Sequence, residues 1–148
     1  MVRQQHATSC GAACCCQLLL DLGLQVTEAD VCLRAGFVPG RPLSANALVK
    51  ALNALHPGAS YKGGSVDPSV LDALVARGPF LALLKVTHGK HWVIVDRLAP
   101  LVSEGHVEIR DPAGSHEDAH VGAEAIMALD EFHQRWLNTT NCVVFRET

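Results

Sequence analysis

The sequence predicts an α+β fold in which helices come first and an antiparallel sheet comes second. Before Gly78, apolar residues recur with helical spacing, and after Pro79 they gather in short β-type runs separated by turn residues. The chain has 148 residues, of which 49% are hydrophobic and 18% charged, which is enough for one sizeable core. Because we find no internal repeat, low-complexity tract or linker, we expect a single domain over residues 1–148.

The first predicted helix covers residues 10–22 and is apolar on nearly every side, so it belongs in the middle of the core. Ser9 precedes it as a good N-cap, and Gly23 ends it. Cys10 is its first residue. Three consecutive cysteines, Cys14 to Cys16, follow on the same helix, where we expect them only to fill space.

Three further helices are predicted before the change of period. The first covers residues 27–35, with Thr27 as its cap. The next covers residues 44–55 and ends at a Pro-Gly turn. The last covers residues 67–77, where Pro68 occupies the favoured first helical position.

The second half of the chain is predicted to form the sheet. Residues 80–86, 91–98 and 106–110 are short β-type runs. Residues 122–137 again have a helical pattern, and residues 142–145 make a last apolar strand. We therefore expect the buried N-terminal helix to pack on a C-terminal antiparallel sheet.

Charge and composition exclude several classes of protein. The net charge of −3 and the lack of a Lys/Arg cluster argue against a nucleic-acid partner. No apolar run reaches about eighteen residues, so we expect no membrane span, and Gln17 and Asp21 interrupt the run that could have been a signal peptide. Because three of the six cysteines are adjacent, we expect reduced thiols. These features predict a cytoplasmic protein, or one delivered into a target-cell cytoplasm as part of a larger secreted protein.

Cys10 is the candidate nucleophile. A helix N-terminus, with its unpaired N–H groups and positive dipole end, stabilises the thiolate that a reactive cysteine needs. Gly11 follows it, and we expect this glycine to let a substrate backbone approach closely. The alternative is a buried structural thiol.

His91 is the candidate base among eight histidines. It opens a predicted strand and shares a face with Val93 and Val95, so it points to the core side. His88 and His106 remain alternatives, because one precedes a glycine turn and the other starts a strand. The remaining histidines are expected in loops or on polar helix faces: His6, His56, His116, His120 and His133.

Asp111 is the candidate acid. It continues the apolar face of the strand that carries Val107 and Ile109, from which a carboxylate can reach the imidazole and fix its tautomer. Asp96 is expected to point to the opposite face of its strand. The alternative for Asp111 is an ordinary strand-ending turn.

Gln4 is the candidate oxyanion donor. It lies a short loop before Cys10, where its amide could donate to a developing oxyanion. The chain order Cys, His, Asp indicates a cysteine hydrolase.

A metal site is the second chemical hypothesis. Cys10 and Cys14 lie four residues apart on one helix, and His88 with His91 would complete a Cys2His2 set. No paired Cys-x-x-Cys or His-x3-His spacing supports this site, so we expect no metal and no cofactor.

These motifs together resemble the papain-like peptidases that process double-glycine leader peptides, which are N-terminal domains of bacteriocin-exporting ABC transporters. That family has a glutamine six residues before the cysteine of a Cys-Gly-x-Ala-Cys motif, then His-aromatic, then Asp-Pro. Gln4, Cys10 to Cys14, His91-Trp92 and Asp111-Pro112 match those positions. The resemblance implies a papain-like fold in which Cys10 attacks, His91 transfers the proton, Asp111 orients His91, and Gln4 with the Cys10 N–H holds the oxyanion.

The sequence also departs from this family. Ser9 stands where the transporter domains commonly carry aspartate, and no transmembrane or ATPase segment follows. We therefore expect a freestanding leader peptidase or the catalytic domain of a toxin or effector, with a peptide or protein substrate and, in the latter case, a cognate inhibitor or immunity protein. Two alternatives stay open: an acyl-transfer enzyme, such as a glutamine deamidase or a transglutaminase-like protein, and an inactive module that only binds peptides or a partner.

Overall fold

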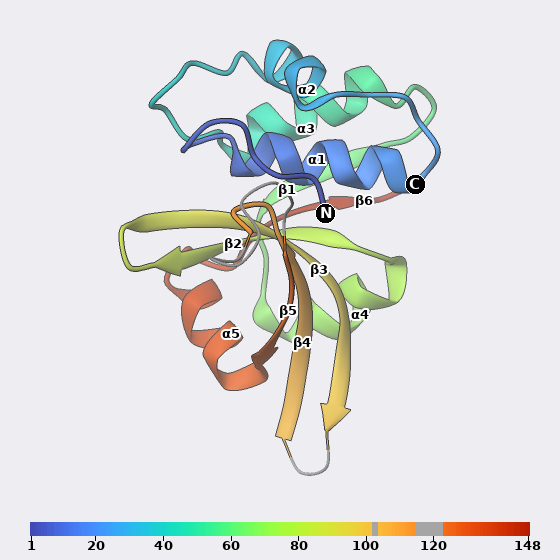
Figure 1. Cartoon of the computed structure of the whole chain (residues 1–148). Helices are drawn as coiled ribbons and strands as arrows, with labels where there is room; N and C mark the ends of the chain where they lie inside the picture. The colour runs from blue at the N-terminus through green and yellow to red at the C-terminus, as the bar shows by residue number, and fades with distance from the viewer. Residues whose placement is uncertain (102–103, 115–122) are drawn as a thin grey trace.

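The computed structural model describes residues 1–101, 104–114 and 123–148, which form a six-stranded antiparallel sheet with helices on both faces (Figure 1). The strand order is β1-β6-β2-β3-β4-β5. The helices are α1 (Cys10–Asp21), α2 (Glu28–Ala35), α3 (Ala45–Leu55), the short 3-10 helix η1 (Pro68–Val70), α4 (Leu71–Arg77) and α5 (Leu129–Leu137). The strands are β1 (Tyr61–Ser65), β2 (Phe80–Val86), β3 (Gly89–Leu101), β4 (Glu104–Asp111), β5 (Ala123–Ala128) and β6 (Cys142–Arg146).

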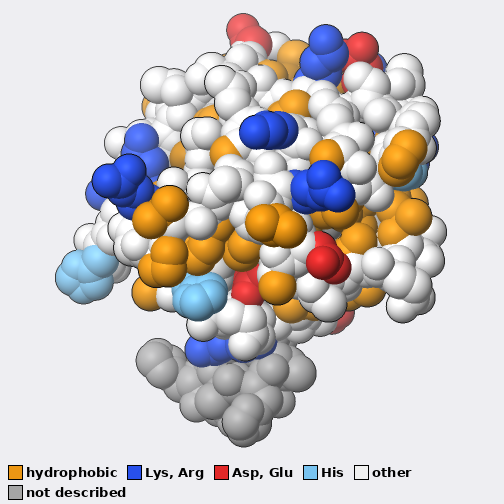
Figure 2. All heavy atoms as spheres, turned by 90° about the horizontal axis from the view of Figure 1, so that it is seen from above, with side chains coloured by type: hydrophobic (Ala, Val, Ile, Leu, Met, Phe, Trp, Pro, Cys, Tyr) orange, Lys and Arg blue, Asp and Glu red, His pale blue; other side chains and the backbone are white. Residues whose placement is uncertain are grey.

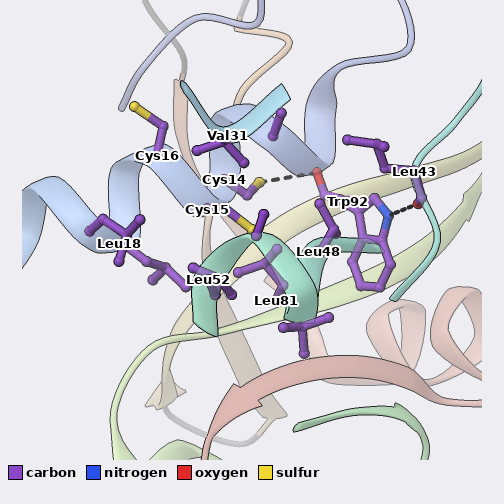
Figure 3. Close-up of a cluster of buried hydrophobic side chains, with 14 of the residues drawn as sticks. Cys14, Cys15, Cys16, Leu18, Val31, Leu43, Leu48, Leu52, Leu81 and Trp92 are labelled. Carbon is purple, nitrogen blue, oxygen red and sulfur yellow. Dashed lines mark hydrogen bonds between the residues drawn. The ribbon is translucent and has the colours of Figure 1, made fainter. Parts of the chain in front are cut away.

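Helices α1, α2 and α3 cover one face of the sheet (Figure 1). Helix α1 is buried, as its apolar composition predicts, and Cys14 and Cys15 have no exposed surface. Figure 3 shows these thiols in a cluster with leucines of α3 and with Trp92 from the sheet. The outer surface of this layer, seen from above in Figure 2, exposes apolar side chains among basic ones. One exposed apolar residue of α2 is Leu33.

Helices α4 and α5 cover the opposite face, where Phe132 and Trp136 anchor a second core. Successive residues of β3 alternate between the two cores. Trp92 contributes to the core below α1, and Val93 contributes to the core above α5. Strand β3 is therefore buried on both faces, and its register is fixed from both sides.

Most predicted elements are confirmed. The four N-terminal helices form, and Thr27 caps α2 in a capping box with Asp30. Strand β2 has the predicted bounds, whereas β3 and β4 extend further than predicted. Within the described residues, no helix is long and apolar enough to cross a membrane.

Ser9 occupies the predicted N-cap position of α1, but its side chain does not cap the helix. Its side chain makes no capping hydrogen bond, because the hydroxyl instead donates to the carboxylate of Glu28 at 2.9 Å and accepts the N–H of His6 at 3.0 Å. The N-terminal N–H groups of α1 are therefore not covered by a Ser9 cap.

The predicted helix over residues 122–137 is only partly correct. Residue 122 lies outside the described residues, β5 occupies Ala123–Ala128, and α5 begins at Leu129. Strand β5 forms because it pairs with β4 along its length, and this ladder overrides a weak local helical preference. Strand β1 was not predicted, because its two central glycines lower its β-propensity.

Candidate active site

The first helix and the third strand are joined at Cys10. The Cys10 sulfur accepts the backbone N–H of Trp92 at 3.5 Å, and the Cys14 thiol donates to the Trp92 carbonyl oxygen, also at 3.5 Å (Figure 3 draws the second bond). The backbone N–H and the carbonyl oxygen of Trp92 are thus both bound by cysteine side chains that lie one helical turn apart on α1. Since His91 is the preceding residue, this contact fixes its position relative to the Cys10 sulfur.

The side chains of His91 and Asp111 meet across the neighbouring strands β3 and β4. The Nε2 N–H of His91 donates to Oδ1 of Asp111 at 2.6 Å. The same carboxylate oxygen accepts the N–H of Ala113 at 2.8 Å, which holds it in place. The Cys10 side chain lies near enough to the His91 ring to raise its pKa. Because Nε2 is occupied by Asp111, Nδ1 is the ring nitrogen that remains for the sulfur.

The pKa shifts of His91 and Asp111 favour the charged form of both side chains. Burial lowers the pKa of His91, but the hydrogen bond with Asp111 and the nearby Cys10 side chain raise it more, to about 9. Burial raises the pKa of Asp111, but the hydrogen bond and the charge of His91 outweigh it, so the net change is a lowering. At neutral pH a protonated His91 ring therefore lies between the Asp111 carboxylate and the Cys10 sulfur.

The other thiols lie in surroundings that disfavour the thiolate. Burial raises the pKa of Cys14 and Cys15 well above the ordinary range, and it raises that of Cys16 to about 11. Cys32 is also raised to about 11 by burial. These thiols are expected to be poor nucleophiles.

Gln4 is placed beside the acid but is turned into its own loop. Its backbone N–H donates to the carbonyl oxygen of Pro112 at 2.9 Å. Its side-chain amide nitrogen donates to the carbonyl oxygens of His6 at 2.8 Å and Ala7 at 3.1 Å. Among the described residues, its buried Oε1 has no hydrogen-bond partner. Donation to an oxyanion would require one of the two amide bonds to be exchanged for the substrate.

The alternative bases are not part of the His91–Asp111 pair, and the hypothetical Cys2His2 site does not assemble among the described residues. His88 is exposed in the turn between β2 and β3, and His106 is paired opposite Ala128, five residues along β4 from Asp111. No three potential metal-ligand side chains gather in the described parts of the chain. His116 and His120 lie outside the described residues.

Asp96 points away from His91, as predicted. Its carboxylate accepts two hydrogen bonds from the Arg110 guanidinium, at 2.8 and 2.9 Å, and Arg110 also binds Asp21 at the end of α1 at 2.8 Å. This network ties the helical layer to the sheet one residue before Asp111.

The predicted role of Gly11 in substrate approach is wrong. Gly11 is buried within α1, where a Cβ atom would lie 2.9 Å from side-chain carbons of both Leu48 and Trp92. The glycine is needed because α3 and β3 pack closely against this turn of the helix.

Sequence reasoning missed Glu28. This residue is the first of α2, is only 6% exposed, and binds the backbone N–H of Gln5 and the hydroxyl of Ser9. An acid in the first turn of a helix is common, because it interacts well with the helix dipole. No periodic signal therefore distinguishes Glu28 from a surface acid.

The chain was compared with known families and structures. The peptidase C39 family matches residues 1–145. The comparison with curated proteins found no match. The peptidase domain of Streptococcus ComA, a bifunctional ABC transporter involved in quorum sensing, is similar with a TM-score of 0.74 and 19% identity over 98% of this chain and 95% of that chain. A double-glycine motif protease from an AMS/PCAT transporter, solved in complex with the leader peptide, is similar with a TM-score of 0.71 and 19% identity over 99% of this chain and 89% of that chain.

Proposed function

Because this chain belongs to the peptidase C39 family and is a cysteine peptidase, we propose that Cys10, His91 and Asp111 form its catalytic triad, within a single domain. The predicted papain-like fold and the resemblance to double-glycine leader peptidases are both confirmed. The observation that carries the proposed triad is the 2.6 Å bond between His91 and Asp111, next to Trp92, whose backbone N–H donates to the Cys10 sulfur.

The proposed reaction is an acyl transfer through the Cys10 sulfur. The thiolate attacks the carbonyl carbon of the scissile bond, and the oxygen of that carbonyl becomes an oxyanion. The backbone N–H of Cys10, which has no acceptor inside its own helix, and the Gln4 amide hold this oxygen. His91 then gives its proton to the leaving amine, and a thioester remains on Cys10. A water molecule, losing a proton to His91, attacks the thioester and releases the acid and the thiol.

The role of Asp111 in this proposal is to orient His91 and to stabilise its positive charge. The bond to Nε2 turns Nδ1 toward the sulfur, and the bond from Ala113 prevents the carboxylate from rotating away. Asp111 itself stays ionised throughout, because its pKa lies below the ordinary range.

The proposed substrate is an extended peptide segment, of the class that the AMS/PCAT protease binds as its leader peptide. A role as the catalytic domain of a toxin or effector, with a cognate immunity protein, stays a prediction, as does a cytoplasmic location. The products distinguish the three possibilities. Hydrolysis of a peptide bond gives two shorter peptides, acyl transfer to an amine gives a cross-linked species, and binding without catalysis gives no product.

The test is incubation of the protein with a peptide library that includes leader-like peptides with a Gly-Gly end, followed by mass spectrometry. We expect two product peptides from each substrate, with no deamidated or cross-linked species. Cys10→Ala should abolish the products, and Asp111→Asn should lower kcat by orders of magnitude while leaving substrate binding in place. Products that persist with Cys10→Ala would contradict the proposed nucleophile.

A further inference from the structure

The loop that precedes the nucleophile, residues 4–9, has few contacts that hold it in place. Within it, the N–H of His6 donates to the Ser9 hydroxyl and the N–H of Ser9 donates to the His6 carbonyl oxygen, so these bonds close the loop on itself. The carbonyl oxygen of Ser9 accepts the N–H of Ala13 in α1. Apart from that bond, two backbone bonds tie the loop to the other described residues: the N–H of Gln4 binds Pro112, and the N–H of Gln5 binds Glu28. The position of this loop depends strongly on these two acceptors.

The Glu28 carboxylate holds both ends of the segment between Gln4 and Cys10. Its two oxygens accept the N–H of Gln5 at 3.2 and 3.0 Å, and Oε1 also accepts the hydroxyl of Ser9 at 2.9 Å. Ser9 is fully buried and directly precedes Cys10. One side chain of α2 therefore contacts the residue after the proposed oxyanion donor and the residue before the proposed nucleophile.

This carboxylate is costly to bury. Burial raises the pKa of Glu28, although the hydrogen bonds from Ser9 and Gln5 partly offset that effect. A buried acid adds less to stability than an apolar side chain of similar size would, whereas it fixes the groups that bind to it. The first turn of α2 lowers this cost, because the helix N-terminus favours a negative charge.

We propose that Glu28 is a positioning residue, which holds the loop of residues 4–9 so that the Gln4 amide and the Cys10 sulfur act on the same substrate carbonyl. This inference rests on the proposed triad and oxyanion donor. Loss of the charge weakens the bonds to Gln5 and Ser9, so Gln4 moves away from its position while the peptide-binding surface stays in place. The effect is therefore on kcat more than on KM.

The test uses Glu28→Gln, which keeps the shape of the side chain and one acceptor oxygen but removes the charge. We expect kcat for peptide cleavage to fall about ten- to hundredfold with KM within about twofold of wild type, because a small misplacement of catalytic groups is enough for such a loss. Glu28→Asp, which keeps the charge but has a shorter reach, should give a smaller loss. Asp30→Asn is the matched control, since Asp30 lies in the same helical turn and, among the described residues, its carboxylate binds only the N–H of the N-cap Thr27.

A second measurement does not depend on turnover. Amide hydrogen exchange at Gln5 should be faster in Glu28→Gln and unchanged in Asp30→Asn, because only Glu28 accepts that N–H. Unchanged exchange and unchanged kcat in Glu28→Gln would overturn the proposal, as would an equal fall of kcat in Asp30→Asn at the same melting temperature. If the wild-type protein cleaves no peptide, the proposed function fails, while exchange at Gln5 still decides whether Glu28 holds the loop.

Discussion

Asp111 accepts one N–H of the His91 ring, and this single bond decides which ring nitrogen faces the sulfur. The same bond explains the raised pKa of His91, since an imidazolium is the better donor to a carboxylate. The N–H of Trp92 adds a neutral donor to the Cys10 sulfur. At the scale of single residues, the Cys10 sulfur thus lies beside the charged pair of His91 and Asp111.

Cys10 should be the fastest-alkylated of the six cysteines. It lies at a helix N-terminus beside His91, whereas burial raises the pKa of the half-buried competitors Cys32 and Cys142. Brief treatment with iodoacetamide, followed by mass mapping of the labelled peptides, measures this order. Preferential labelling of Cys32 or Cys142 with Cys10 unmodified would contradict the thiolate assignment.

Gln4 and Gln5 should respond differently to replacement by alanine. Gln4→Ala should lower kcat by about two to three orders of magnitude, the usual loss for one oxyanion donor, with little change in substrate binding. Gln5→Ala should be nearly silent, because the Gln5 side chain is exposed and binds only the Arg3 carbonyl oxygen, while its backbone N–H is retained. Steady-state kinetics on one peptide measure both. The reverse result would make Gln5 the donor, and two silent variants would place the oxyanion on other groups.

At the scale of elements, the site depends on how α1 is seated on β3. The thiols of Cys10 and Cys14 hold the Trp92 backbone, and the Trp92 indole N–H donates to the Leu43 carbonyl oxygen at 3.0 Å (Figure 3). Gly11 lies at the closest approach of these elements. A change of packing at this point therefore moves the nucleophile relative to the base.

Gly11→Ala should destabilise the protein by about 1–3 kcal/mol, because the added methyl group overlaps Leu48 and Trp92 in a closely packed core. Urea unfolding measures the loss, and peptide cleavage should fall with it because α1 shifts against β3. Gly105→Ala is a suitable control, since the closest contact of its new methyl group is the movable Cδ2 end of Leu129 at 3.0 Å, and its next contact, the Leu129 Cβ at 3.5 Å, is an ordinary van der Waals distance. Wild-type stability and turnover in Gly11→Ala would show that α1 and β3 pack less closely than described.

The elements differ in how far the sequence predicts them. Helix α1 is predictable because it is apolar on nearly all sides and Gly23 follows its C-cap, and β2 because it is a short apolar run between turn residues. Strand β5 is rich in alanine and gains its conformation only from pairing with β4. The motif spacing likewise predicts that His91 meets Asp111, and the structure shows this contact. The contact of Glu28 with Ser9 could not be predicted, because it joins residues of separate elements and no local sequence pattern reflects it.

At the scale of the whole molecule, the proposed catalytic groups come from the helical layer and from the sheet. Cys10 belongs to the layer of α1, α2 and α3, and the His91–Asp111 pair belongs to β3 and β4. The Arg110 network with Asp21 and Asp96 joins the two parts. The ionisation of the site is therefore linked to the stability of the entire fold.

The free energy of unfolding should fall as the pH rises from about 6.5 to about 9. His91 has its ordinary pKa of 6.5 when unfolded and a pKa of about 9 when folded, so its contribution is complete below the first value and lost through the second. The buried thiols of α1, whose pKa values are raised above 9, add to the loss only at higher pH. Urea titrations at several pH values measure this slope. Asp111→Asn should flatten it, and an equal slope in that variant would contradict the assigned role of the pair.

Strand β6 lies between β1 and β2 in the interior of the sheet, although it is the last strand of the chain. Its residues Val143 and Val144 enter the two cores on opposite faces. Neither core is complete without β6, so the helical layer on one face of the sheet and the α4–α5 layer on the other depend on the same strand.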